Sequence, residues 1–179
     1  MKKILLLFII LSTISCKKEA EPIAFDNSII KDTVLNIIIR PIHPDLLTEK
    51  SDSVKLYYKK FNFHEIWYLD ENRKDLINEI KFCYQEGLNP KDYEIEIIED
   101  LESKREKLKD DEIVKYDILL TETFEKLANH LYKGKLNPKE LYKDWDLQPK
   151  EIALSPILES SIKEKSIASS FKKLKPNHL

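Results

Sequence analysis

Glycine is the residue type that most constrains this chain, because only two glycines occur among its 179 residues. Phosphate-binding loops, dinucleotide-binding folds and tight hairpins all need glycine, where φ is positive or where a backbone approaches closely. Two glycines disfavour all three and leave a helix-rich fold. Because 42% of residues are hydrophobic and 35% are charged, the composition is typical of a globular domain with solvated helix faces rather than a disordered chain.

The charges nearly cancel, with 30 Lys and Arg against 32 Asp and Glu and a net charge of -2. A protein that grips nucleic acid through phosphate contacts carries an excess of basic residues. The balance therefore predicts no nucleic-acid partner.

The N-terminus has the pattern of a targeting signal. Lys2 and Lys3 precede an apolar run at residues 4–11, which is far too short to cross a bilayer. Ser15 and Cys16 follow, and this order resembles a bacterial lipoprotein signal in which the cysteine becomes the lipidated first residue. We expect a signal peptide at residues 1–15 and a lipidated Cys16 with a flexible tether at residues 16–50. An uncleaved N-terminal anchor is the alternative.

Lipid on Cys16 would hold the chain on a membrane of the cell envelope, and we expect the domain to face the periplasm. Which membrane and which face remain open at this point. Cys83 is then the one cysteine left, so no disulfide is expected within a chain. Its apolar neighbours predict a buried structural thiol rather than a reactive one.

Apolar residues recur at steps of three and four, the spacing of one helix face, and the fold is expected to be mostly α. The clearest stretch begins at Ile113 and reaches Leu131, and it predicts a central core helix that ends at Gly134. A compact multi-helix domain is expected at residues 51–179, with Ser51 as a candidate N-cap. The other expected helices cover about residues 51–60, 74–86, a third beginning at 89–90, 152–158 and 163–173. The strand-like run at 34–39 predicts a short edge strand or an extended arm.

Two glycines punctuate the helices in the same way. Residues 87–93 and 134–142 both read glycine, leucine, Asn-Pro-Lys, acid, tyrosine. Glycine is the usual residue that ends a helix in the left-handed conformation, and Asn-Pro suits an N-cap followed by a first helical position. The near copy predicts either a duplicated helical hairpin or independent use of the same capping chemistry. A break near Tyr93 is expected in the helix that follows Asn89.

Residues for catalysis or metal binding do not gather in any known pattern. The four histidines are scattered, and no two have the spacing that holds zinc. His130 could act as a general base, although a capping or partly buried histidine fits its place near a helix end. Acidic pairs such as Glu94 and Glu96 lie in highly charged segments, which predicts a solvated face rather than paired catalytic carboxylates. We therefore expect no catalytic residue, no metal and no cofactor.

An aromatic cluster occurs between the first two expected helices and includes Phe61, Phe63 and Trp67. Such a cluster could form a platform for carbohydrate. Aromatic side chains more often fill a core, because each buries a large apolar area. We expect Trp67 to be a core residue.

Several motifs in order resemble the scaffold domain that precedes the catalytic domain in large murein L,D-transpeptidases. The matching pieces cover about residues 54–178. They are Phe63-x-x-x-Trp67, Glu86-Gly87-Leu88-Asn89-Pro90-x-Asp92-Tyr93, Tyr116-Asp117-Ile118-Leu119-Leu120-Thr121-x-x-Phe124, His130-Leu131-x-x-Gly134-x-Leu136-Asn137-Pro138, Trp145 and Leu174-x-Pro176-x-His178.

The resemblance implies a non-catalytic helical scaffold that takes part in peptidoglycan cross-linking and remodelling. The family's catalytic Ser-x-Gly-Cys motif does not occur here, so a truncated product, a split gene or a stand-alone scaffold is expected. The implied partners are peptidoglycan or a transpeptidase catalytic domain. A stand-alone envelope adaptor or ligand-binding lipoprotein is the alternative, and activity of the chain itself is a third possibility. The residues expected to form the core or a docking surface are Trp67, Tyr93, Phe124, Leu127, His130 and Trp145.

Overall fold

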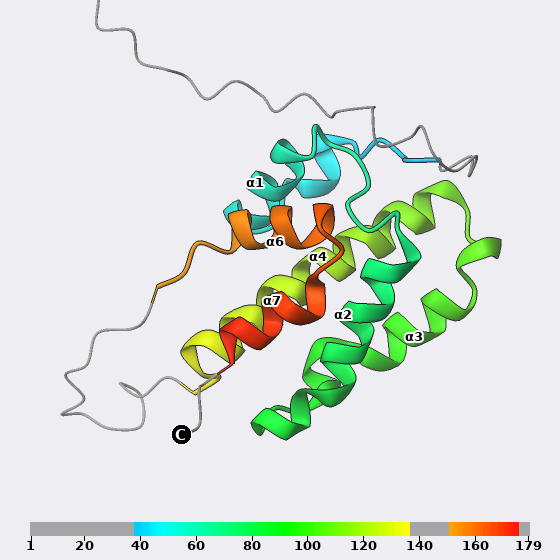
Figure 1. The fold of residues 1–179 in the computed structure, drawn as a ribbon. Coiled ribbons are helices and arrows are strands. Elements are labelled where there is room, and N and C mark those ends of the chain that lie inside the picture. The colour runs from blue at the N-terminus through cyan, green and yellow to red at the C-terminus, as the bar shows by residue number, and fades with distance from the viewer. Residues whose placement is uncertain (1–37, 137–150, 176–179) are drawn as a thin grey trace, which may run out of the picture.

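The computed structural model describes residues 38–136 and 151–175, and this part of the chain is helical with no strand (Figure 1). The predicted α class is confirmed. The α-helices are α1 (Asp52–Lys60), α2 (Asp70–Phe82), α3 (Ile95–Ser103), α4 (Asp110–Lys133), α6 (Leu154–Lys163) and α7 (Ile167–Leu174). Short 3-10 helices are η2 (Pro44–Leu47), η3 (Cys83–Glu86), η4 (Pro90–Tyr93) and η5 (Arg105–Lys107).

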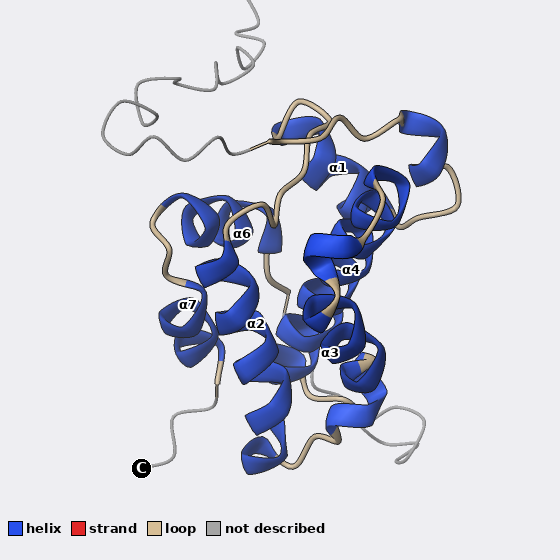
Figure 2. Cartoon of the chain, turned by 90° about the vertical axis from the view of Figure 1, so that its right-hand side faces the viewer, coloured by secondary structure: helices blue, strands red, loops and turns tan. Residues whose placement is uncertain are grey.

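The longest helix, α4, forms the centre of the packing, as predicted. Helices α1, α2, α3 and α7 all contact it, while α6 pairs with α1 and α7 packs on α2 (Figure 2). Its buried face includes Ile113, Leu120 and Leu131 at the expected spacing. The helix ends at Gly134, whose φ is +87°. A single apolar face therefore organises four neighbouring helices.

The domain starts before the first long helix. Ser51 caps α1 as predicted, since its hydroxyl accepts a hydrogen bond from the amide of Val54 at 3.1 Å. Upstream of it, Ile42 and Leu47 are each only 2% exposed and belong to the core. The segment assigned to the tether thus packs on the domain over its last residues, because these apolar side chains belong to the same hydrophobic core as the helices.

An extended arm at residues 40–42 carries the chain into the domain. Its backbone pairs with the segment after α1 through Ile42 N to Phe63 O at 2.7 Å and Glu65 N to Arg40 O at 2.9 Å. The contact is a single antiparallel bridge between Pro41 and His64 rather than a strand. The sequence predicted an edge strand or an extended arm at residues 34–39. The end of that run, Ile38 and Ile39, leads into this extended arm, and residues 34–37 lie outside the described residues.

The connection between α2 and α3 follows the predicted capping pattern. Helix α2 begins at Asp70, earlier than expected, and tightens into η3 before Gly87 takes a φ of +77°. Leu88 folds back so that its amide donates to the carbonyl of Cys83 at 3.2 Å, and its side chain is buried. Glu94 then takes a φ of +54° and separates η4 from α3, which is the break predicted near Tyr93.

The second copy of this pattern lies outside the described residues from Asn137 onward. Beyond it, α6 carries Pro156 in its first turn, as predicted, where the missing amide hydrogen costs no helical bond. The last helix begins at Ile167 rather than near residue 163, because Lys165 takes a φ of +50° and turns the chain between α6 and α7.

Candidate functional site

The aromatic segment after α1 is buried against α4. Trp67 is 1% exposed, and its indole N-H donates to the Thr121 hydroxyl at 3.0 Å. Its ring lies 6.0 Å from that of Phe124, which meets Phe171 of α7 at 5.2 Å in an edge-on contact. Of the two interpretations of Trp67, the structure places it in the core rather than on an open carbohydrate platform.

A buried carboxylate fixes this segment to α4. Asp117 accepts hydrogen bonds from the amides of Ile66 (3.0 Å) and Trp67 (2.7 Å) and from the Tyr58 hydroxyl (2.7 Å). Thr121, one turn further, contacts the same Tyr58 hydroxyl at 3.0 Å. In the sequence, the sign of this site is that two polar residues, Asp117 and Thr121, lie on the apolar face of α4. Their hydrogen-bond partners lie some fifty residues earlier in the sequence, so no local pattern could identify them.

The electrostatics of Asp117 follow from its complete burial. Burial raises the pKa of Asp117 to about 7. The hydrogen bonds from Tyr58, Trp67 and Ile66 act in the opposite direction and lower this pKa, but the effect of burial is larger. The nearby Glu65 carboxylate adds to the increase in pKa. A carboxyl group in this position holds backbone in place and has no open space in which a substrate could reach it.

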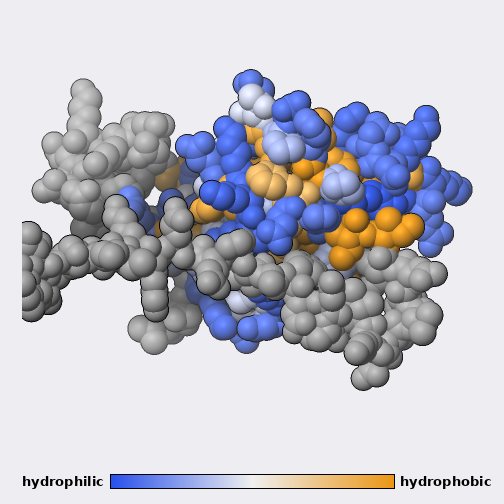
Figure 3. Space-filling model, turned by 90° about the horizontal axis from the view of Figure 1, so that it is seen from above, coloured by the Kyte–Doolittle hydropathy of each residue, from blue (hydrophilic) through white to orange (hydrophobic). Residues whose placement is uncertain are grey.

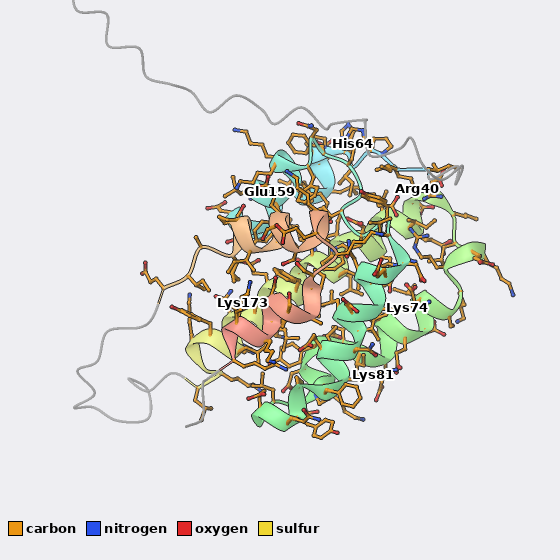
Figure 4. The ribbon with its side chains drawn as sticks, viewed as in Figure 1. Arg40, His64, Lys74, Lys81, Glu159 and Lys173 are labelled. Atoms are coloured by element: carbon orange, nitrogen blue, oxygen red, sulfur yellow. The ribbon has the colours of Figure 1, made fainter. Side chains whose placement is uncertain are left out.

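Glu65 is a second buried acid, and two arginines neutralise it. Arg105 of η5 approaches one oxygen at 2.6 Å and Arg40 of the N-terminal arm approaches the other at 3.3 Å. Arg40, which is labelled in Figure 4, also bonds Asp110, the first residue of α4, at 2.5 Å. The cluster ties the arm, the aromatic segment and the start of α4 together at one end of the domain.

Arg73 makes a comparable bridge between α2 and α3. Its guanidinium is buried and bonds Glu102 at 2.9 Å and the carbonyls of Trp67 and Tyr68 at 2.9 and 3.0 Å. Glu102 also accepts from the hydroxyl of Tyr116 at 2.8 Å. Because each charged group has partners, the cluster is a structural joint rather than a free charge awaiting a ligand.

Tyr93 and His130 meet at the opposite end of α4. The Tyr93 hydroxyl lies 2.8 Å from His130 Nδ1, and the phenol is fully buried while the imidazole is half-buried. Lys126 donates to the carbonyl of Asp92 at 2.6 Å and lies 5.8 Å above the Tyr93 ring. Burial, together with the charge of Lys126, lowers the pKa of His130 below its ordinary value. His130 is therefore neutral near pH 7 and joins η4 to α4.

The remaining sequence candidates fall into two groups. Leu127 is completely buried in the same core as Phe124, and Cys83 is 1% exposed. Burial raises the pKa of the Cys83 thiol to about 11, so it stays protonated and unreactive near pH 7. Trp145 and Cys16 lie outside the described residues. The structure thus brings Trp67, Phe124 and Leu127 into one core and pairs Tyr93 with His130 further along α4.

Two shallow grooves mark the surface of the described part. One, of about 420 Å³, lies between η2 and α1 and is lined by Pro44, Leu47, Leu56 and Phe63 with lysines at its edge. Figure 3 looks onto this end of the domain and shows hydrophobic surface between hydrophilic side chains. The other, of about 400 Å³, lies between α2 and α3 and is lined by Ile77 and by polar residues that include Lys74, Asn78, Lys81 and Ser103, although apolar atoms make up most of its exposed surface.

Within residues 38–136 and 151–175, His, Cys, Asp and Glu side chains form no group that could hold a metal ion. No helix in these same ranges is long and apolar enough to cross a membrane.

These features define a helical structural module, because the side chains that stand out in the sequence serve to hold helices together. A family model described as "Scaffold domain" matches residues 52–179, which is more than half of the chain. The chain belongs to this family, and the match is consistent with the resemblance to the scaffold domain of L,D-transpeptidases. No curated protein and no solved structure matches the chain.

We expect Asp117→Ala to destabilise the domain by about 4 kcal/mol, because it leaves two buried amides and a buried hydroxyl without an acceptor. Asp117→Asn keeps an acceptor oxygen and should cost markedly less. Denaturant unfolding followed by circular dichroism measures both. The exposed Asp111→Ala on the same helix is the matched control and should change stability by about 0.5 kcal/mol or less. Equal losses for the Asp117→Ala and Asp111→Ala variants would contradict the assigned role.

The raised pKa of Asp117 also predicts a dependence of stability on pH. The folded state binds a proton more tightly than the unfolded state, so this stabilisation is complete below about pH 4 and is lost as pH rises toward 7. We therefore compare the unfolding free energies of the wild type and of Asp117→Asn at pH 5 and at pH 8. The stability of the wild type relative to the variant should be greater at pH 5 than at pH 8. Using the difference cancels other groups such as His130. A difference that does not change with pH would refute the prediction.

Proposed function

We propose that the chain is a lipid-anchored, non-catalytic scaffold for peptidoglycan cross-linking, which acts by packing against an L,D-transpeptidase catalytic domain or by positioning murein. The observation that carries the proposal is the family match over residues 52–179. The ordered motifs of the resemblance, which run through Trp67, Tyr93 and His130, support the narrower assignment to cell-wall remodelling.

The positions of the motif residues support a role in shape rather than chemistry. Trp67, Asp117 and Phe124 are all buried, and they join the aromatic segment to α4. Tyr93 and His130 join η4 to the other end of the same helix. Residues that a family retains for catalysis need access to a substrate, whereas these contribute to a rigid helical body.

A rigid body of this kind suits a scaffold for physical reasons. Buried ion pairs and hydrogen bonds such as Glu65 with Arg105 allow few alternative packings of the helices. When a partner domain docks on such a body, the scaffold itself loses little conformational freedom. The domain can therefore hold a catalytic partner or a murein strand in a fixed orientation relative to its own helices.

Binding to purified components tests the scaffold. We expect residues 16–179 carrying Cys16→Ser to bind an isolated L,D-transpeptidase catalytic domain from the same organism with a Kd of about 1–10 μM, or to sediment with purified murein sacculi. Isothermal titration and pelleting at physiological salt give the readouts. The Asp117→Ala variant is the control for dependence on the fold. Absence of binding in both assays would reject the proposal, and formation of cross-links by the chain alone would reassign it as an enzyme.

The lipid anchor has its own test. Cells expressing the chain should incorporate labelled palmitate into it, and Cys16→Ser should remove the label and release the chain from the membrane fraction, because acyl chains supply the membrane affinity. Cys83→Ala is the matched control and should keep both the label and the membrane location, since that thiol is buried in the domain. Retention of Cys16→Ser in the membrane fraction would contradict lipid anchoring there.

A further inference from the structure

The groove between η2 and α1, which we call the η2–α1 groove, is lined mainly by apolar side chains. They are Pro44, Leu47, Leu56 and Phe63, and the groove has a volume of about 420 Å³, which lies in the range of pockets that bind ligands. Leu56 is 46% exposed, and Leu46 of η2 is 44% exposed. Exposed apolar side chains that gather in one place mark an interaction surface.

Two lysines of α1 give this groove a positive edge. Lys55 and Lys59 both line it and are four residues apart, so they lie on one face of the helix, where like charges destabilise each other. Lys55 makes a long contact of 3.8 Å with the fully exposed Asp52. Lys59 has no ion-pair partner among the residues that the structure describes. An occupant with apolar side chains and acidic groups therefore complements the η2–α1 groove.

The groove between α2 and α3 lacks this property. Its Lys81 pairs with Glu99 at 2.5 Å, and its Lys74 pairs with Asp70 at 2.6 Å. The lysines of that groove already have acidic partners within the domain. An acidic occupant would gain less there than beside α1.

The N-terminal arm enters the domain next to the η2–α1 groove. The Ile42 amide donates to the carbonyl of Phe63, a lining residue, at 2.7 Å, and Pro44, two residues further along, lines the groove too. Figure 1 shows the first described residues and η2, in blue and cyan, beside α1. Residues upstream of 38 are thus attached close to the groove. A segment joined by a short link has an effective concentration of about millimolar, so even weak docking is populated.

One stretch of the chain upstream of the arm has the composition that this groove requires. Ile23 and Phe25 are two residues apart, so in an extended chain their side chains point to the same side. Glu21 and Asp26 flank this pair and provide the acidic groups. The stretch at residues 21–26 therefore combines two apolar anchors with two negative charges.

Other apolar stretches before the arm fit the groove less well. Ile29 and Ile30 are followed by Lys31, which the lysines of the groove would repel. The run at 34–39 continues directly into the arm, which leaves no length of chain for a return to the groove. Eleven residues, 27–37, link the stretch at 21–26 to the described chain. When extended they span about 40 Å, so the stretch can reach the groove.

We propose that residues 21–26 dock in the η2–α1 groove of the same chain, with Ile23 and Phe25 on the apolar lining and the flanking acids beside the two lysines. The consequence of docking rests on the lipid anchor of the proposed function. Docking shortens the free link after Cys16 from 21 residues (17–37) to four (17–20). The reach of that link falls from about 70 Å to about 14 Å. The tether thus has a short state and a long state, and a partner that displaces residues 21–26 extends the reach of the scaffold.

Cross-linking within the chain tests the docking. Residues 16–179 carrying Cys16→Ser and Cys83→Ala, which remove both native thiols, receive Ala24→Cys and Thr48→Cys. Thr48 lines the groove, and Ala24 lies between the two anchors, so the proposed contacts stay intact. Mild oxidation should join the two new cysteines within one chain, and mass spectrometry gives the rate. Adding Ile23→Ala and Phe25→Ala should slow this reaction about tenfold or more, because apolar burial drives the docking.

A second variant and a matched control accompany this test. Reversal of the positive edge by Lys55→Glu, Lys59→Glu should also slow cross-linking, because the acids of the segment are then repelled. Ile29→Ala, Ile30→Ala removes two apolar side chains from the same tether outside residues 21–26 and should leave the rate unchanged. Circular dichroism confirms that each variant keeps its fold.

The outcomes separate the docking from the proposed function. Equal rates with and without the two apolar anchors would overturn the docking. Cross-linked dimers whose share rises with protein concentration would assign the groove to a second copy of the chain and overturn it as well. Neither result involves lipid, murein or a transpeptidase, so the scaffold proposal would stand in both cases. Conversely, a chain that binds neither murein nor a catalytic domain can still show the expected cross-link.

Discussion

One carboxylate, that of Asp117, determines where the rest of the domain can pack. It lies in the first third of the central helix and accepts hydrogen bonds from the backbone amides of Ile66 and Trp67, so a segment without regular structure is fixed against α4. Because that segment is fixed, Trp67 can fill the space beside Phe124, and Phe124 in turn meets Phe171 of the last described helix. The apolar core supplies most of the stabilisation, but the buried acid restricts it to a single arrangement.

Two further buried polar contacts fix other segments near the two ends of α4. Glu65 and its arginines fasten the arm at the start of the helix, and the Tyr93–His130 contact fastens η4 near its finish. The groups involved are those a search for enzymes would flag first: buried acids, a histidine and a tyrosine. In this fold each has its partners within the chain. The arrangement agrees with membership of the scaffold family, since these chemically capable residues hold helices at fixed positions.

Local patterns in the sequence were sufficient to predict elements whose causes are local. The spacing along α4, the glycine at position 87 and the break after Tyr93 follow from steps of three and four and from capping chemistry, and the structure has all three. The acceptor role of Asp117 and the packing of Ile42 were not predictable, because their partners lie far away in sequence. Phe82 and Tyr84, which are 49% and 56% exposed, were not identified as surface residues, because apolar residues within a helical pattern are expected to face the core.

The N-terminal arm gives the domain a defined route for mechanical load. Tension applied at residue 38 reaches the paired backbones of residues 40–42 and 63–65 before any helix, and those backbones run antiparallel. From there the pull passes through Glu65 to η5 and through the amides of Ile66 and Trp67 to Asp117 of α4. A chain tethered at its N-terminus would thus transmit a pull through the buried Asp117 joint as well as along the backbone toward α1.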